Sequence, residues 1–270
     1  MMNRKKIKHK AYYLPNSFHK HFSGYQTNQL SKTDIQKLKG NSNSKGGNTV
    51  SDFTGWIYDS IIPEKKQTQN LEFGKEGEKR VYEEIIDELD KSDEYFKGYY
   101  HSFLDDDWAL EYEDLSDGQK EVFKISSLRS NGAAIYGKPD IVYRNRKNND
   151  RIIIEVKTTS YNTDIPRGGW YNLQCQLWSY AHIDSFKDSE NIFLMGDIRR
   201  RRFMRGNTLK LHGKKVNTPS HYSYTPSGVF PRWRFKKGGE INTAHKEVNM
   251  FHQQCKMIFE LYGGEYFEHQ

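Results

Sequence analysis

Residues 139–157, PDIVYRNRKNNDRIIIEVK, carry the clearest structural pattern of the chain. Apolar, β-branched and aromatic residues stand on both sides of a polar turn near Asn148, which predicts two antiparallel strands joined as a hairpin. Side chains alternate between the two faces of a strand, so Glu155 and Lys157 project from one face. A turn near Asn148 also returns Asp140 beside Glu155 or diagonally across from it. The sequence therefore predicts a cluster of two carboxylates and one ammonium.

This cluster has the side chains that phosphodiester hydrolysis needs. Hard divalent cations take oxygen ligands and keep water, and a metal-bound water becomes a nucleophile when its pKa falls. We expect Asp140 and Glu155 to be metal ligands, with the backbone carbonyl of Val156 as a further ligand. The ammonium of Lys157 can orient or deprotonate the water, or offset charge on the phosphorane oxygens. The sequence leaves these roles of the lysine open.

The segments GKPDIVY and IIIEVK resemble the signature of the PD-(D/E)XK nuclease superfamily. Its catalytic acids and lysine correspond to Asp140, Glu155 and Lys157. The resemblance implies an α/β fold with a restriction-endonuclease-like core, in which a mixed central sheet is flanked by helices. It also implies a metal-dependent DNA nuclease that uses one or two Mg²⁺ ions, or Mn²⁺ in their place.

An upstream motif is similar to the first motif of Holliday-junction resolvases. Residues 74–78, GKEGE, open a predicted helix, and the resemblance implies that Glu78 is a further catalytic acid and metal ligand. Glu76 is the alternative acid. Acids are also common in a first helical turn as partners of the helix dipole, which is the structural alternative for Glu78.

A downstream motif, QLWSY, resembles the QxxxY motif of the RecB nuclease subfamily. A spacing of four residues places Gln176 and Tyr180 on one helix face, and the resemblance implies that both line the DNA-binding side of the site. Gln174 is an alternative for the glutamine. Burial of the tyrosine in the core is an equal alternative to a functional role.

Charge and cysteine content restrict the partners and cofactors. The chain has 42 Lys+Arg against 35 Asp+Glu, a net charge of +7, which favours a polyanionic partner such as DNA. Several RecB-like relatives carry an iron–sulfur cluster bound by four cysteines; this chain has 2, so we expect no such cluster. No apolar run of the length of a membrane span and no signal peptide is present, so we expect a soluble cytoplasmic protein without a membrane partner.

Composition divides the chain into three parts. Residues 1–50 carry ten Lys/Arg and one acid, and are expected to be a flexible basic arm. Residues 51–198 are expected to be the nuclease core, with an acidic insertion or an irregular hairpin at about 87–121. Residues 199–270 are expected to be a basic and aromatic extension that engages DNA, followed by a C-terminal helix.

The basic extension mixes cations with aromatic rings, as proteins do that bind unpaired nucleic acid. The residues expected to bind nucleic acid are Arg199, Arg200, Arg201, Arg202, Arg205, Tyr222 and Trp233. A solvated basic face is the alternative.

These features predict exonuclease or flap-type action on single-stranded DNA ends, with other replication or recombination proteins as further partners. A structure-selective or restriction-type endonuclease is the first alternative. An RNA-processing nuclease and a non-catalytic nucleic-acid-binding protein with the same fold are the others.

Overall fold

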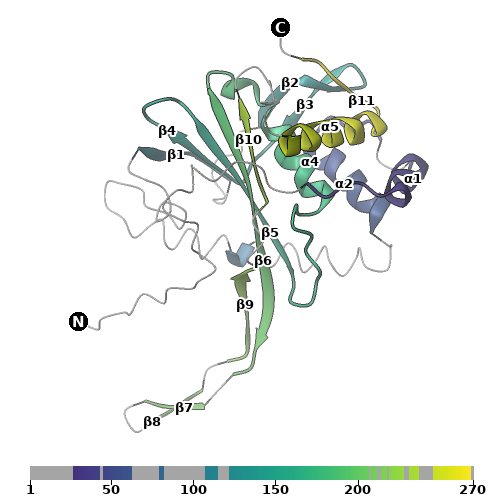
Figure 1. Cartoon of the computed structure of the whole chain (residues 1–270). Coiled ribbons are helices and arrows are strands. Elements are labelled where there is room, and N and C mark those ends of the chain that lie inside the picture. The colour runs from purple at the N-terminus through teal and green to yellow at the C-terminus, as the bar shows by residue number, and fades with distance from the viewer. Residues whose placement is uncertain are drawn as a thin grey trace.

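The computed structural model describes residues 27–42, 45–62, 79–81, 107–114, 122–206, 208–211, 214–217, 219–227, 231–236 and 246–268. It has a curled mixed sheet with helices packed against it (Figure 1). The expected α/β class and the mixed sheet flanked by helices are therefore confirmed. No helix in the described part of the chain is long and apolar enough to cross a membrane.

The main sheet of the described residues has six strands. They are β1 (Trp108–Glu113), β4 (Ile141–Asn145), β5 (Arg151–Ser160), β6 (Asn191–Met204), β9 (His221–Pro226) and β10 (Arg232–Lys236). Their order is β1-β4-β5-β6-β10, and β9 also pairs with β6. The β5–β6 pair is parallel and the other pairs are antiparallel.

The predicted hairpin is formed by β4 and β5. Ile141 pairs with Ile154, so continuing the register by one residue brings Asp140 opposite Glu155. In the turn, Asn149 has a φ of 59°, a left-handed conformation that asparagine adopts more readily than most residues. The register of the hairpin thus places the two acids opposite one another, as predicted.

Helix α4 (Tyr171–Tyr180) lies in the connection between the parallel strands β5 and β6. The first six residues of β5 are all buried, which explains why their apolar run does not alternate with polar residues. A Cβ added to Gly196 of β6 would lie 2.9 Å from Leu173 Cδ2. The missing side chain therefore allows α4 to pack closely on the sheet beside the predicted acids.

The other helices of the described residues are α1 (Lys32–Gly40), α2 (Val50–Ile61), α5 (Lys246–Leu261) and the short 3₁₀ helix η3 (Asp184–Phe186). Helices α2 and α5 pack against α4, α1 packs against α2 and α5, and η3 packs against strand β2 (Phe123–Ser130) (Figure 1). A capping box starts α2, in which Thr49 Oγ1 accepts from Asp52 N and Asp52 Oδ2 accepts from Thr49 N. Aromatic rings fill the core between α2 and α5; Phe53 and Phe259, for example, meet edge to face at 5.0 Å.

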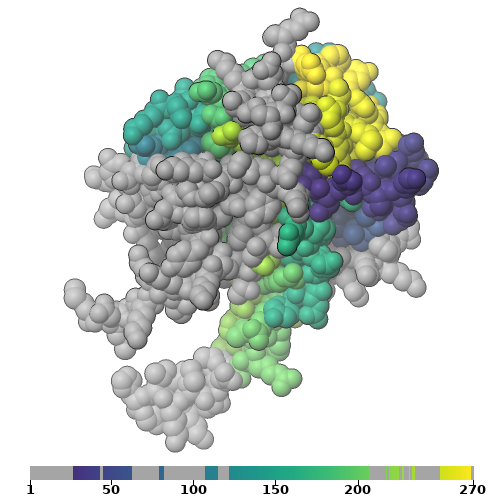
Figure 2. Space-filling view, viewed as in Figure 1, coloured from purple at the N-terminus to yellow at the C-terminus, as the bar shows by residue number. Residues whose placement is uncertain are grey.

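Two smaller sheets complete the described structure. Strands β2 (Phe123–Ser130), β3 (Ala133–Gly137) and β11 (Gly264–Tyr266) form one, in the order β11-β2-β3. Strands β7 (Thr208–Leu211) and β8 (Lys214–Asn217) form the other. In Figure 1, β7 and β8 lie at the end of a long ribbon made by β6 and β9, and Figure 2 shows this ribbon projecting from the body of the molecule.

Two segments contain regular secondary structure that was not expected from the sequence. Part of the expected flexible arm is folded: α1 lies within it, Leu38 is fully buried, and Asn28 Nδ2 donates to Gly169 O at 2.7 Å. Part of the expected acidic insertion or irregular hairpin is strand β1, which forms the edge of the main sheet by pairing with β4. In the first case contacts with distant segments order a stretch whose own composition is polar. In the second, Trp108, Leu110 and Tyr112 recur at every second position, which is the period of a half-buried strand.

Candidate functional site

The two central acids lie opposite one another in the register of the β4–β5 hairpin, Asp140 just before β4 and Glu155 in β5. Asp140 Oδ2 accepts a hydrogen bond from the backbone N–H of Val156 at 2.7 Å. Asp140 is 9% exposed and Glu155 is 1% exposed, so both carboxylates are held in a largely desolvated place. Burying carboxylates is costly unless they are paired or bind a cation. The groups that contact the two carboxylates therefore indicate what the site can do.

Glu155 is held by two donors. Its Oε1 accepts from Lys157 Nζ at 2.7 Å and from Gln176 Nε2 at 2.6 Å. The lysine projects from the same face of β5, as the strand period predicts, and its side chain is 23% exposed. The ammonium therefore lies at the rim of the site, while the carboxylate lies beneath it.

Gln176 and Tyr180 of α4 form a chain of hydrogen bonds to the acid. Gln176 Nε2 donates to Tyr180 Oη at 3.1 Å, and this hydroxyl donates to the carbonyl of Lys138 at 2.7 Å. Burial, followed by the negative charges of Glu155 and Asp140, raises the pKa of Tyr180 well above 10.0. The neutral hydroxyl thus accepts from the amide and orients it, so that the same nitrogen also donates to the carboxylate.

The structure separates the two candidate glutamines. Gln174 is fully buried, but it donates to Gly169 O at 3.3 Å and accepts from Gln254 Nε2 at 3.1 Å. These bonds connect α4 with α5 and the preceding loop, and none of them joins Gln174 to either acid. Gln176 is therefore the glutamine at the acidic cluster.

The donor set suits a hard divalent cation. Asp140 and Glu155 offer carboxylate oxygens, and the N–H and C=O of one strand residue point to the same edge, so the Val156 carbonyl is directed toward the Asp140 side. Oxygen donors of this kind fit Mg²⁺ or Mn²⁺. Among the described residues no group of three or more His, Cys, Asp or Glu side chains is arranged to hold a metal. Glu78 and its alternative Glu76 lie outside the described residues.

Two neighbours of the site were not predicted from the sequence. Asp114, which follows β1, donates its backbone N–H to Asp140 O at 2.9 Å. Its carboxylate also forms an ion pair with Lys138 at 2.5 Å. These contacts hold the backbone on both sides of Pro139. They depend on the pairing of β1 with β4. The alternation in WALEYE, residues 108–113, could have indicated the strand but not its partner.

Two of the residues expected to bind nucleic acid lie in the protein interior. Trp233 is fully buried and stacks on Phe251 with ring centroids 4.1 Å apart. Arg199 is 2% exposed and donates from Nε to Asp197 Oδ2 at 3.0 Å. These two expectations are corrected. Both side chains lie in the packed interior, because other segments cover the parts of β6 and β10 that carry them.

The remaining predicted residues of the extension are more accessible. Arg202 and Arg205 are exposed, while Arg200, Arg201 and Tyr222 are partly buried. The guanidinium of Arg201 lies over the Tyr222 ring, 4.6 Å from its centroid. The extension therefore retains a basic and aromatic surface, but a smaller one than the sequence indicated.

Comparisons with known proteins give little similarity. No protein-family model matches the chain, and no curated protein matches it. Among solved structures, the chain is similar to SSO0001, known from a crystal structure, with a TM-score of 0.26 and 14% identity over 83% of this chain and 84% of that chain. A TM-score this low does not establish a common fold, so the function is inferred below from the residues of the site alone.

Proposed function

We propose that this chain is a metal-dependent DNA nuclease of the PD-(D/E)XK type, with a restriction-endonuclease-like core. The observation that carries the proposal is the cluster of Asp140, Glu155 and Lys157 at the β4–β5 hairpin. The cluster places two buried carboxylates beside one ammonium. Carboxylate oxygens brought together in this way are the ligands that a hard divalent cation takes.

The residues divide the chemistry of hydrolysis among them. A bound Mg²⁺ or Mn²⁺ supplies Lewis acidity and a water of lowered pKa. Asp140, Glu155 and the carbonyl of Val156 hold the ion. Lys157, at the rim, donates either to the attacking water or to a non-bridging phosphate oxygen as negative charge develops there.

Gln176 and Tyr180 act as positioning residues. The amide of Gln176 holds Glu155 Oε1, and the hydroxyl of Tyr180 holds the amide. Such outer hydrogen bonds orient metal-binding carboxylates, and their loss commonly lowers metal affinity or activity by about 10- to 100-fold. Both residues therefore support the site without touching the phosphodiester.

DNA with unpaired ends is the proposed substrate. The net charge of +7 favours a polyanion, and the exposed Arg202 of the extension lies over the exposed ring of Tyr161, which combines a cation with an aromatic surface. We assign exonuclease or flap-type action, with other replication or recombination proteins as further partners. The proposal places the protein in the cytoplasm, where such substrates are found.

A substrate panel tests the proposal. The full chain is incubated with Mg²⁺, Mn²⁺ or EDTA on linear and circular DNA, single-stranded and duplex, and on RNA of the same sequence. The expected result is divalent-dependent loss of linear single strands while circles survive. Cutting of circles would instead identify an endonuclease, and cutting of RNA alone an RNA-processing enzyme. Binding without cleavage on every substrate would refute the proposal, and Asp140→Asn controls for contaminating nucleases.

A further inference from the structure

The arginine run of β6 is divided between the two faces of the sheet. Strands β5 and β6 are parallel, with Lys157 beside Ile198 and Thr159 beside Arg200. Residues directly beside one another in neighbouring strands project from the same face, and the strand period is two. Arg200 and Arg202 therefore lie on the face that carries Lys157 and the acidic cluster.

The intervening arginines lie on the opposite face. Arg199 is buried against Asp197, and Arg201 lies over the ring of Tyr222. Their charges are therefore directed away from the acidic cluster. This arrangement provides two arginine pairs of equal charge on one strand, which differ in the face from which they project.

Tyr161 lies just beyond the end of β5, beside the face of the sheet that carries Lys157. Its ring is 54% exposed, and the guanidinium of Arg202 lies 5.6 Å from the ring centroid. Position 161 is four residues beyond Lys157, or about 13 Å at ~3.3 Å per strand residue. This is about four steps of a stacked nucleic-acid strand at ~3.4 Å each.

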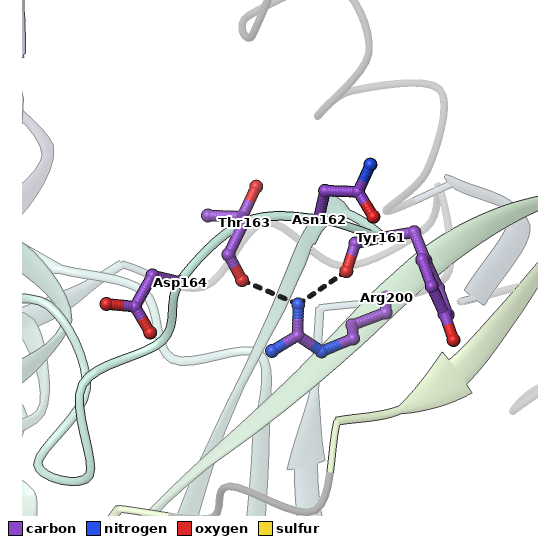
Figure 3. A pocket seen from close by; sticks show the side chains of 5 residues that line it. All are labelled: Tyr161, Asn162, Thr163, Asp164 and Arg200. Atoms are coloured by element: carbon purple, nitrogen blue, oxygen red, sulfur yellow. Dashed lines mark hydrogen bonds between the residues drawn. The ribbon is translucent and has the colours of Figure 1, made fainter.

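A shallow, open cavity of about 420 Å³ lies at the loop that follows β5. Its lining is Tyr161, Asn162, Thr163, Asp164 and Arg200 (Figure 3). Arg200 Nη1 donates to the carbonyls of Tyr161 at 2.7 Å and Thr163 at 2.6 Å. The guanidinium is therefore fixed in the wall of the cavity rather than solvated as a mobile charge. The side chains of Asn162 and Asp164 add hydrogen-bond donors and acceptors.

We propose that Arg200, Arg202, Tyr161 and this cavity form a strand-binding face for the unpaired part of a nucleic-acid strand. This rests on the proposed function, because it places the cleaved bond at Glu155 and Lys157 and the strand along the ribbon of β6 and β9. The arginines meet phosphates. The cavity and the tyrosine ring receive a base, which only an unpaired nucleotide presents, because in a duplex its edge is paired and its faces are stacked.

Binding in EDTA tests the strand-binding face without cleavage. The full chain is titrated into labelled single strands of about 12 nucleotides, within the site sizes of such grooves, and into the matching duplex. Tyr161→Ala should weaken single-strand binding by about 5- to 150-fold and change duplex binding much less, because one stacked base loses its aromatic partner. Tyr161→Phe keeps the ring and should restore binding. Tyr161 is exposed, so both variants should unfold at the wild-type temperature.

The arginines provide the matched comparison. Arg202→Gln should weaken binding and reduce the log–log salt slope by about 0.7, because the variant neutralises one phosphate fewer on a single strand. Arg201→Gln removes the same charge from the opposite face and should cost less affinity. Equal decreases in affinity for the two arginine variants, or equal decreases on single strand and duplex for Tyr161→Ala, would overturn the proposal.

Cleavage separates this inference from the proposed function. Substrates shortened from either end should lose their dependence on Arg202 once fewer than about four nucleotides remain on one side of the cut. Cleavage that requires metal but is indifferent to Arg202 at every length would overturn the strand-binding face and leave the nuclease standing. Selective single-strand binding that depends on Tyr161, in a chain that cuts no substrate, would support the face and refute the nuclease.

Discussion

Replacing Gln176 by methionine keeps the length of the side chain and removes both amide donors. In the native protein one of them reaches Glu155 Oε1 at 2.6 Å, and the other reaches Tyr180 Oη at 3.1 Å. A hydrogen bond to a charged group contributes about 1.5–3 kcal/mol to stability. We expect Gln176→Met to lower the free energy of unfolding by this amount, and the metal affinity or cleavage rate by about 10- to 100-fold.

Gln174→Met is the matched control. Gln174 lies on the same helix, is also buried, and also uses its amide in hydrogen bonds, but its partners are Gly169 and Gln254. This variant should lose about 1 kcal/mol for each neutral hydrogen bond and keep the metal dependence of the wild type. Urea unfolding measures the first effect, and single-turnover cleavage across a Mg²⁺ titration measures the second.

The comparison distinguishes a positioning role from a packing role. If Gln176 only fills the core, both variants lose stability and neither changes the Mg²⁺ concentration needed for half-maximal cleavage. That result would refute the assignment of Gln176. A shift in Mg²⁺ dependence confined to Gln176→Met would support it, because both variants remove a buried amide and only one touches the acid.

Five further variants test the site and the core. Asp140→Asn and Glu155→Gln should each abolish divalent-dependent cleavage while oligonucleotide binding persists, and full activity in either would contradict the metal-ligand assignment. Lys157→Ala should slow turnover severely with little change in metal affinity by calorimetry, because an ammonium cannot ligate a cation. Trp233→Ala should cost about 3–5 kcal/mol of stability through a buried cavity, and a stable variant defective only in binding would restore its role as a stacking residue. Burial lowers the pKa of His252 from 6.5 to about 4, so as the pH falls the unfolded chain takes up the proton before the folded chain does. The free energy of unfolding should therefore fall by about 2–3 kcal/mol between pH 7 and 4.5. His252→Asn should make this decrease smaller, as measured by urea unfolding at each pH.

The hairpin and the acidic cluster were predictable from the sequence because their determinants are local. A polar turn between two β-branched runs sets the register of a hairpin, and the period of two sets which side chains share a face. Asp140, Glu155 and Lys157 follow from these two rules together. The four-residue spacing likewise placed Gln176 and Tyr180 on one side of α4, where their side chains meet.

The identity of the buried residues in the basic extension could only come from the tertiary structure. Trp233 and Arg199 belong to a segment whose basic and aromatic composition is typical of an exposed surface. Their side chains nevertheless lie in the interior, where β10 pairs with β6. Whether an arginine of β6 is buried or accessible depends on which face of the strand is covered. Tyr161 lies beside Arg202 because β5 and β6 pair in parallel. Local sequence determines period and turn, whereas burial depends on the segments, distant along the chain, that pack against each face.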